Sequence, residues 1–281
     1  MKINYVPLLE ICRKIQGHPR GRQRFSEYLK KMLRQDGQEV EYTPLVLMNP
    51  MAREHVTLLL DDLVELGAEE LAANTVSEIL PAVEHLDGEF NASLIVVDDE
   101  KGGWTNRYAY EYDLRRIQSL QEMNETQAAR FWITGVLWSS EVVSTEAIVD
   151  AMRTAVYRAV WVQAFQYARS LRDFLTQESG VMLLSQCQCP GGDSSLSTHS
   201  HDILEALYSE TEKRSFIECA FGDPAAESLG YTQLGLEEFA GLRLAYNETL
   251  GVGSRNDLAN HFPWMSAEMI GFCEQIMKGG A

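Results

Sequence analysis

The chain has 281 residues, of which 45% are apolar, and a formal net charge of −17. This composition can form a large buried core and excludes intrinsic disorder. Nucleic acid and anionic lipid are polyanions that require a basic surface, so the charge argues against either as a general partner. Five scattered cysteines, an odd number, are typical of reduced thiols rather than of a disulfide framework.

The apolar segments indicate a cytoplasmic protein with no membrane insertion. Residues 1–7 lack the apolar core of a signal peptide. Arginine and glutamine interrupt the most apolar stretch, residues 155–165, well short of the length that spans a bilayer.

Basic residues are concentrated near the start of the chain. Residues 13–34 carry eight lysines and arginines against one glutamate, and helices are expected at residues 6–15 and 24–34. One interpretation is that this segment forms ion pairs with the acidic body or a solvated helix face. The other is an anion site in which Arg24 and neighbouring arginines bind phosphate or carboxylate through their guanidinium groups.

Four apolar runs of strand length each end abruptly in polar residues. They cover residues 43–48, 93–97, 132–138 and 181–185. Helical patterns separate most of them, which predicts βα units of a parallel sheet with a ligand site outside the carboxyl ends of the strands. Periodicity does not distinguish short apolar runs from buried helix, so the last two runs are also compatible with helix.

The remaining pattern is helical. Further helices are expected near residues 51–67, 68–83, 145–177, 201–219, 236–246 and 266–277. The predicted fold class is therefore α/β, with a mostly parallel sheet of about four strands flanked by helices and a helical C-terminal part; the alternative is a helix-dominated α+β fold. We expect a core domain at residues 1–190, including the basic helical segment, and a helical region at 191–281 packed on it, unless the two form a single domain.

Residues 98–116 contain the densest mixture of chemical groups. In the functional interpretation Arg107 clamps an anion, Asn106 orients the ligand, and Asp98 or Glu111 acts as acid or base. Trp104 and Tyr108 add aromatic surface. The alternative is a structural loop plugged by Trp104, and if the segment is helical Arg107 and Glu111 pair with each other as i,i+4 neighbours.

Two other strand ends carry candidate residues. Asn49 followed by Pro50 predicts the start of a helix, whose free N–H groups attract anions, with Arg53 and His55 in its first turns. The alternative is a capped helix and an ordinary histidine. Ser140 and Glu141 follow the third run without the G-x-S-x-G pattern of serine hydrolases.

Metal binding has one local indication. Cys187, Cys189, His199 and His201 offer two thiolates and two imidazoles, but their spacing differs from that of familiar zinc sites. No H-E-x-x-H, Walker A or G-x-G-x-x-G pattern follows a predicted strand, so no cofactor is expected.

Three functions fit these observations. The first is an intracellular enzyme or binding protein for a small phosphate- or carboxylate-bearing ligand at the sheet edge, and the residues leave open whether it is catalytic. The second is a noncatalytic acidic adaptor whose C-terminal helices bind a protein partner or a second copy, and the third is a zinc-stabilised domain. The residues expected to bind the ligand are Arg24, Asn49, Arg53, Trp104, Asn106, Arg107, Tyr108 and Ser140, and those expected to transfer protons are His55, Asp98, Glu111 and Glu141.

Overall fold

The structure, a computed structural model, describes residues 1–34, 37, 39–100, 105–117, 119–166, 168–193, 195–250, 262 and 264–279. The fold mixes helices and strands, with 57% of residues in helices and 9% in strands. Contacts divide the chain into two compact units. Unit 1 comprises Met1–Thr105 and Leu120–Val156, and unit 2 comprises Asn106–Ser119 and Tyr157–Ala281. This division differs from the expected boundary near residue 190.

Unit 1 contains a parallel sheet of three strands in the order β1-β2-β3. The strands are β1 (Lys2–Tyr5), β2 (Glu89–Val97) and β3 (Trp132–Trp138). β1 pairs with the beginning of β2, and β2 and β3 stay in register until their shared end, where Val97 is opposite Trp138. The parallel sheet and two of the predicted strand runs are therefore confirmed, but a four-stranded sheet is not.

Two of the four predicted strands are helical. Residues 43–48 form the 3-10 helix η1 (Thr43–Leu47), in which Pro44 lies in the first turn, where its missing N–H and fixed φ favour a helix start. Residues 181–185 form the end of helix α8 (Leu171–Ser185). This segment is buried on every side, so it lacks the polar face that would have revealed its period. Strand β1, in contrast, was not predicted.

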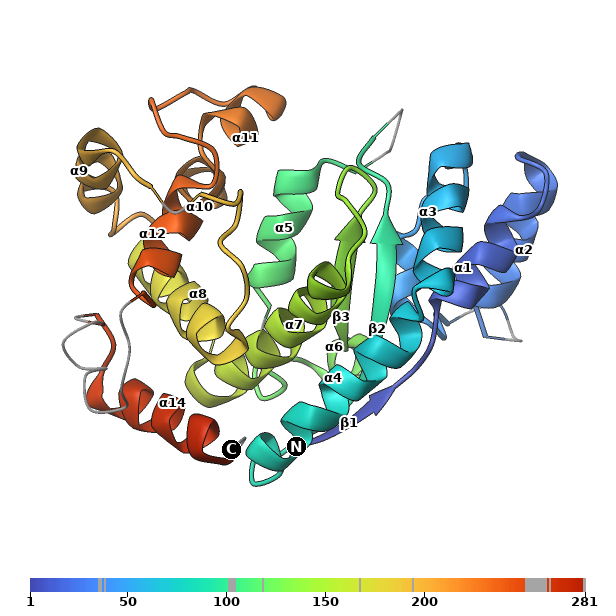
Figure 1. Cartoon of the computed structure of the whole chain (residues 1–281), viewed down its shortest axis with the longest axis horizontal. Coiled ribbons are helices and arrows are strands. Elements are labelled where there is room, and N and C mark those ends of the chain that lie inside the picture. The colour runs from blue at the N-terminus through green and yellow to red at the C-terminus, as the bar shows by residue number, and fades with distance from the viewer. Residues whose placement is uncertain are drawn as a thin grey trace. The chain divides into compact units, whose positions relative to one another are not determined.

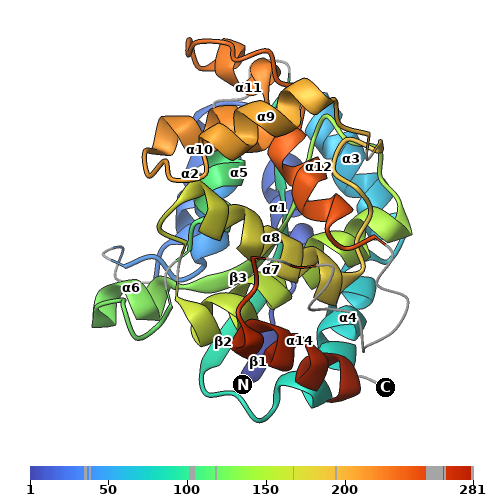
Figure 2. The ribbon, with the colours of Figure 1, turned by 90° about the vertical axis from the view of Figure 1, so that its left-hand side faces the viewer.

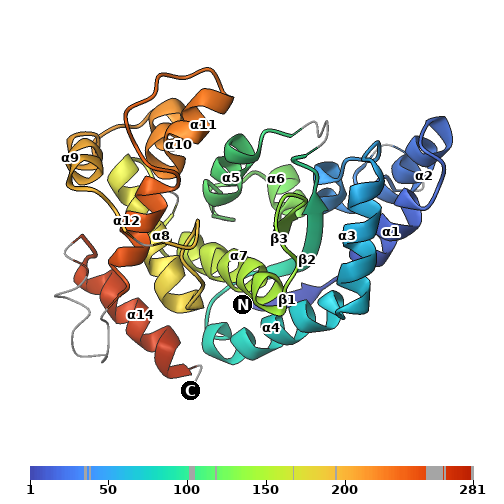
Figure 3. The same ribbon diagram turned by 45° about the horizontal axis from the view of Figure 1, so that its top comes forward.

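Helices cover both faces of the sheet in unit 1. They are α1 (Leu9–Gln16), α2 (Arg22–Met32), α3 (Glu54–Glu65), α4 (Ala68–Val83), α6 (Glu125–Arg130) and the first half of α7 (Thr145–Phe165). α1 and α3 lie to one side of β2 and β3, and α7 lies to the other (Figures 1 and 3). Gly135 of β3 permits the close approach of α7, because a Cβ there would lie 2.6 Å from the sulfur of Met152.

The helix expected to begin at Asn49 and Pro50 begins later. Arg53 is the N-cap of α3, and the helix starts at Glu54. Asn49 instead closes a local turn, because its Oδ1 accepts a hydrogen bond of 2.9 Å from the backbone N–H of Met51. The predicted capping role of Asn49 was therefore wrong, and its amide nitrogen is left to bond elsewhere.

Unit 2 is helical. It contains α5 (Arg107–Arg115), the second half of α7, α8, α9 (Thr198–Ala206), α10 (Lys213–Phe221), α11 (Asp223–Ser228), α12 (Ala240–Asn247) and α14 (Ala267–Gly279). Figure 2 shows α8 at the centre of the unit, and every residue of α8 except Asp173 is buried. The single helix expected at 145–177 is in fact two, because Ser170 and Asp173 form a capping box that starts α8.

Glycines allow α8 to pack closely on its neighbours. A Cβ on Gly180 would overlap the ring of Trp161 in α7, and a Cβ on Gly241 of α12 would lie 3.1 Å from Leu175. Among the helices of the described residues, none combines the length and the apolar character needed to cross a membrane.

Candidate functional site

Polar side chains meet where β2 and β3 end. Asp98 and Asp99 follow β2, and Ser139 and Ser140 follow β3. The backbone N–H of Ser139 donates to the carbonyl of Val97 (3.0 Å), so the ladder between the strands continues into these residues. Together with two side chains that approach from the segment before β2, they form what we call the rim cluster, consisting of Asn49, His55, Asp98, Asp99, Ser139 and Ser140.

Asp98 is the centre of the rim cluster. Its side chain is only 2% exposed, and a carboxylate so buried requires hydrogen-bond donors. Asn49 Nδ2 donates to Oδ2 (2.8 Å), while His55 Nε2 (2.9 Å) and Ser139 Oγ (3.2 Å) donate to Oδ1. Three segments that are distant in sequence are therefore joined at one carboxylate.

Asp99 is coupled to Asp98 through a hydroxyl group. Its Oδ1 lies 3.0 Å from Ser139 Oγ, and its Oδ2 accepts a hydrogen bond of 2.7 Å from Ser140 Oγ. Ser139 has one hydroxyl proton and can donate it to only one of the two aspartates at a time. The two carboxylates therefore compete for the proton of Ser139.

His55 lies in the first turn of α3, with its Nε2 directed at Asp98. A carboxylate only accepts hydrogen bonds, so in the neutral imidazole this contact assigns the ring proton to Nε2 and leaves a lone pair on Nδ1. Within the described part of the chain Nδ1 is buried and has no hydrogen-bond partner, although the side chain is 11% exposed. An imidazole held by a carboxylate through one nitrogen, with the other able to accept a proton, is the arrangement used in general base catalysis.

Other residues expected at the sheet edge in unit 1 have different positions. Arg24 is buried and donates to three oxygen atoms of unit 1, those of His18, Gln16 and Ala52. Arg53 is exposed at the start of α3, and Glu141 is exposed in the turn after β3. Trp104 lies outside the described residues.

The basic segment makes many contacts within unit 1. Arg13 pairs with Asp61 of α3, and Lys30 pairs with Glu27 at 2.6 Å. Lys14 with Glu10 and Arg34 with Glu39 form two more surface ion pairs. These contacts agree with the interpretation that the segment forms ion pairs.

The remaining candidates of residues 98–116 lie on α5 in unit 2. Asn106 is the N-cap of α5, because its Oδ1 accepts a 3.0 Å hydrogen bond from the N–H of Ala109. Tyr108 donates to Glu238 Oε1 (3.0 Å). Arg107 and Glu111 are i,i+4 neighbours with 3.9 Å between their charged atoms, as expected for a helical segment. These contacts hold α5 within unit 2.

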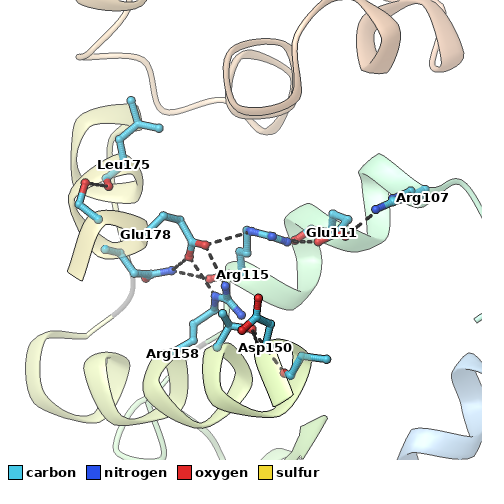
Figure 4. Close-up of polar contacts among 11 residues, drawn as sticks. Arg107, Glu111, Arg115, Asp150, Arg158, Leu175 and Glu178 are labelled. Atoms are coloured by element: carbon cyan, nitrogen blue, oxygen red, sulfur yellow. Dashed lines mark hydrogen bonds and ion pairs between the residues drawn. The ribbon is translucent and has the colours of Figure 1, made fainter. Parts of the chain in front are cut away.

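Glu111 belongs to a buried chain of charges that we call the ion-pair ladder, consisting of Arg107, Glu111, Arg115, Arg158 and Glu178 (Figure 4). Glu178 is fully buried and receives two hydrogen bonds from Arg158, at 2.9 and 2.8 Å, and one from Arg115 at 3.0 Å. Burial opposes ionisation, but Arg158 and Arg115 outweigh it and lower the pKa of Glu178. Burial also lowers the pKa of Arg115 to about 10.

Several of these residues were missed in the sequence. Asp99 and Ser139 are adjacent to residues that were selected, and Arg115 and Glu178 were not considered. A partial signal for Glu178 was present, because this acidic residue lies directly before the apolar segment that ends the helix. Such a residue is rarely buried without a basic partner.

The proposed zinc ligands are not assembled into a site in the described residues, which contain no group of three or more His, Cys, Asp or Glu suited to a metal ion. All five cysteines are free thiols, and Cys187 is buried while Cys189 is partly exposed.

Comparisons of the chain with protein-family models, with curated proteins and with solved structures find no match. Function is therefore inferred from the chemistry of the chain's own residues. Of the two clusters, the rim cluster has an uncommitted acceptor on His55, whereas the glutamates of the ion-pair ladder are neutralised by arginines.

Proposed function

We propose that unit 1 binds a small polar ligand at the carboxyl edge of its sheet and that the His55–Asp98 pair engages it. The observation that supports this proposal is the convergence of Asn49, His55 and Ser139 on one buried carboxylate, with His55 Nδ1 left as an acceptor. The chemistry available there is proton transfer. His55 accepts a proton from the ligand or from a water molecule, and Asp98 stabilises the resulting imidazolium.

The charge of the rim bears on the class of ligand. The expected phosphate or carboxylate group would face Asp98 and Asp99, and like charges at short range repel one another. The lone pair of His55 requires a donor. We therefore propose that the group in contact with His55 is a hydroxyl or an ammonium group, and that Arg53, exposed at the start of α3, is the residue available to an anionic group elsewhere on the ligand.

The adaptor function has less support from the contacts in unit 2. Phe272 of the last helix packs within that unit, with 5.1 Å between its ring centroid and that of Phe165. Trp264 contacts the guanidinium of Arg172 at 4.7 Å but is 51% exposed. Met265 is buried. A cytoplasmic location, and a second copy or protein partner, stay predictions from the sequence.

The test is a thermal-shift measurement with small probes. Ethanolamine, glycerol and glucose present donor groups, while inorganic phosphate and citrate are anionic. A probe at about 100 times its Kd stabilises a protein by roughly 2.7 kcal/mol, which is readily detected as a higher Tm. We expect stabilisation by a probe of the first group.

The matched variants are His55→Gln, which replaces the basic imidazole nitrogen by a non-basic amide, and His85→Gln, which changes an exposed histidine of unit 1. We expect His55→Gln to abolish the stabilisation and His85→Gln to retain it. An equal response in both variants, or a response to phosphate alone, would refute the proposal.

A further inference from the structure

We infer that Arg24 is a positioning residue for the rim cluster, acting through the loop that carries Asn49 and leads into His55. The inference rests on the proposed function, because a positioning role requires a site to be positioned. In the described residues Arg24 makes no hydrogen bond or ion pair with a side chain of the rim cluster; it acts through Gln16 and through the backbone of residues 49–52.

The first observation is the set of acceptors around the Arg24 guanidinium. Nε donates to the carbonyl of His18 (2.7 Å), and Nη1 donates to Gln16 Oε1 (2.7 Å) and to the carbonyl of Ala52 (3.0 Å). The residue is 8% exposed. All three acceptors are uncharged, so this buried arginine is used for directed hydrogen bonds rather than for a salt bridge.

The second observation is the path from Arg24 to the rim. Because Gln16 Oε1 accepts from Arg24, the Gln16 amide must present its nitrogen on the other side, where Nε2 donates to the carbonyl of Asn49 (2.7 Å). The side chain of Asn49 then donates to Asp98 (2.8 Å). The orientation of the Arg24 guanidinium thus fixes that of the Gln16 amide, and the Gln16 amide in turn holds the backbone of Asn49, a member of the rim cluster.

The third observation is that both ends of the loop are held. Gln16 bonds the carbonyl of Asn49, and Arg24 bonds the carbonyl of Ala52, the residue before the N-cap of α3. The loop therefore sets the direction in which α3 begins, and His55 is the second residue of that helix. Asn49 and His55, two of the three side chains that donate to Asp98, are therefore positioned by this loop.

Arginine suits this task better than lysine. Its planar guanidinium offers donors in fixed directions, whereas an ammonium group is a point charge on a flexible stem. Gln16 and His18 also lie at the C-terminal end of α1, the negative pole of the helix, which favours a cation there. Burial, and to a smaller extent Arg20, lower the pKa of Arg24, in agreement with a cation held by neutral partners.

The test uses the whole chain and needs no ligand. Long-range ¹H–¹⁵N spectra report the tautomer of each histidine, and His55→Gln assigns the signals of His55. Arg24→Met removes the guanidinium but keeps an apolar stem, and Arg24→Lys restores the charge. Arg13→Met is the control, because Arg13 belongs to the same basic segment and contacts α3 at the surface.

We expect wild type and Arg13→Met to show one dominant His55 tautomer with the proton on Nε2. Loss of an ordinary hydrogen bond corresponds to a change of about 2- to 10-fold in an equilibrium, so Arg24→Met should lower the ratio of the two tautomers by that factor. Arg24→Lys should restore part of the ratio. If Arg24→Met does not fold, Arg24→Lys becomes the test, and we expect it to lower the ratio of the two tautomers by a smaller factor than that given for Arg24→Met.

Unchanged His55 signals in the folded Arg24 variants would overturn the inference and leave the proposed ligand site intact. Conversely, a shifted tautomer ratio together with a ligand response that survives His55→Gln would refute the proposed function while confirming that Arg24 positions His55.

Discussion

At the scale of single residues, the fold treats its two most buried carboxylates differently. Asp98 receives an amide, an imidazole and a hydroxyl group, which hold the carboxylate without cancelling its charge. Glu178 receives two guanidinium groups, which neutralise it. A carboxylate with neutral donors can still stabilise a developing positive charge, so Asp98 suits chemistry and Glu178 suits structure.

Glu237 gives a prediction for the dependence of stability on pH. Partial burial opposes its ionisation, but hydrogen bonds from Ser200 and Ser197 lower its pKa from 4.5 to about 2. A carboxyl group with a depressed pKa in the folded state stabilises the fold above pH 4.5, and this contribution is lost as the pH falls towards 2.

The variant Glu237→Gln removes that contribution. Near pH 6 we expect it to be less stable than wild type by on the order of 1 kcal/mol, because the site is largely solvated. Urea unfolding at pH 6, 4 and 2.5 should show the two proteins converging as the solution becomes more acidic. A difference that stays constant with pH would contradict the assignment.

Part of the rim cluster was predictable from single residues. Asn49, His55, Asp98 and Ser140 were identified because polar residues that follow apolar runs were expected at one edge. The role of Arg24 was not predictable, because its acceptors at Gln16 and Ala52 are brought near it only by the tertiary path of the chain. Sequence shows which groups are present, but not which of them are already occupied by protein partners.

At the scale of elements, close helix packing in unit 2 depends on Gly180. An alanine inside a helix is normally more favourable than glycine by about 1 kcal/mol. At Gly180 the added methyl group would overlap the Trp161 ring, and overpacking costs about 1–3 kcal/mol. We therefore expect Gly180→Ala to destabilise the protein by up to about 2 kcal/mol in chemical denaturation.

The matched control is Gly271→Ala in α14. No atom lies within 4 Å of the position that its Cβ would take, so only the helix propensity changes. This variant should be more stable than wild type, by up to about 1 kcal/mol. If both substitutions stabilised the protein, the packing of α8 against Trp161 would be looser than described.

The same elements show why strands were only partly predictable. β2, the central strand, has buried positions on both faces along its second half, as expected inside a parallel sheet, whereas β3, at the edge of the sheet, alternates half-buried and buried positions. The end of α8 has an equally apolar sequence but forms a helix, because burial on all sides removes the periodic signal. β1 has only four residues, too few for its alternation to be distinguished from chance.

At the scale of the whole molecule, sequence order and spatial order differ. α5 lies between β2 and β3 in the chain, yet its contacts assign it to unit 2. The division also falls inside α7, at Val156 and Tyr157. A boundary inside a continuous helix leaves no loop, proline or glycine to mark it, so the sequence could not indicate it.

The ion-pair ladder allows this division to be tested by hydrogen exchange. Glu178→Gln would leave Arg158 buried without its carboxylate and Arg115 paired with Glu111 alone, and breaking a buried pair in this way costs about 3–5 kcal/mol. We expect faster exchange in α8, α10 and the second half of α7, and also in α5, although α5 is flanked in sequence by segments of unit 1.

The strands and α4 serve as the internal control for that experiment, because they belong to unit 1. Their exchange should change less than that of α5. Faster exchange in β2 and β3 with protection retained in α5 would contradict the assignment of α5 to unit 2. Such a result would mean that α5 is not destabilised when Glu178 is replaced, and hence that Arg115 of α5 does not depend on its ion pair with Glu178.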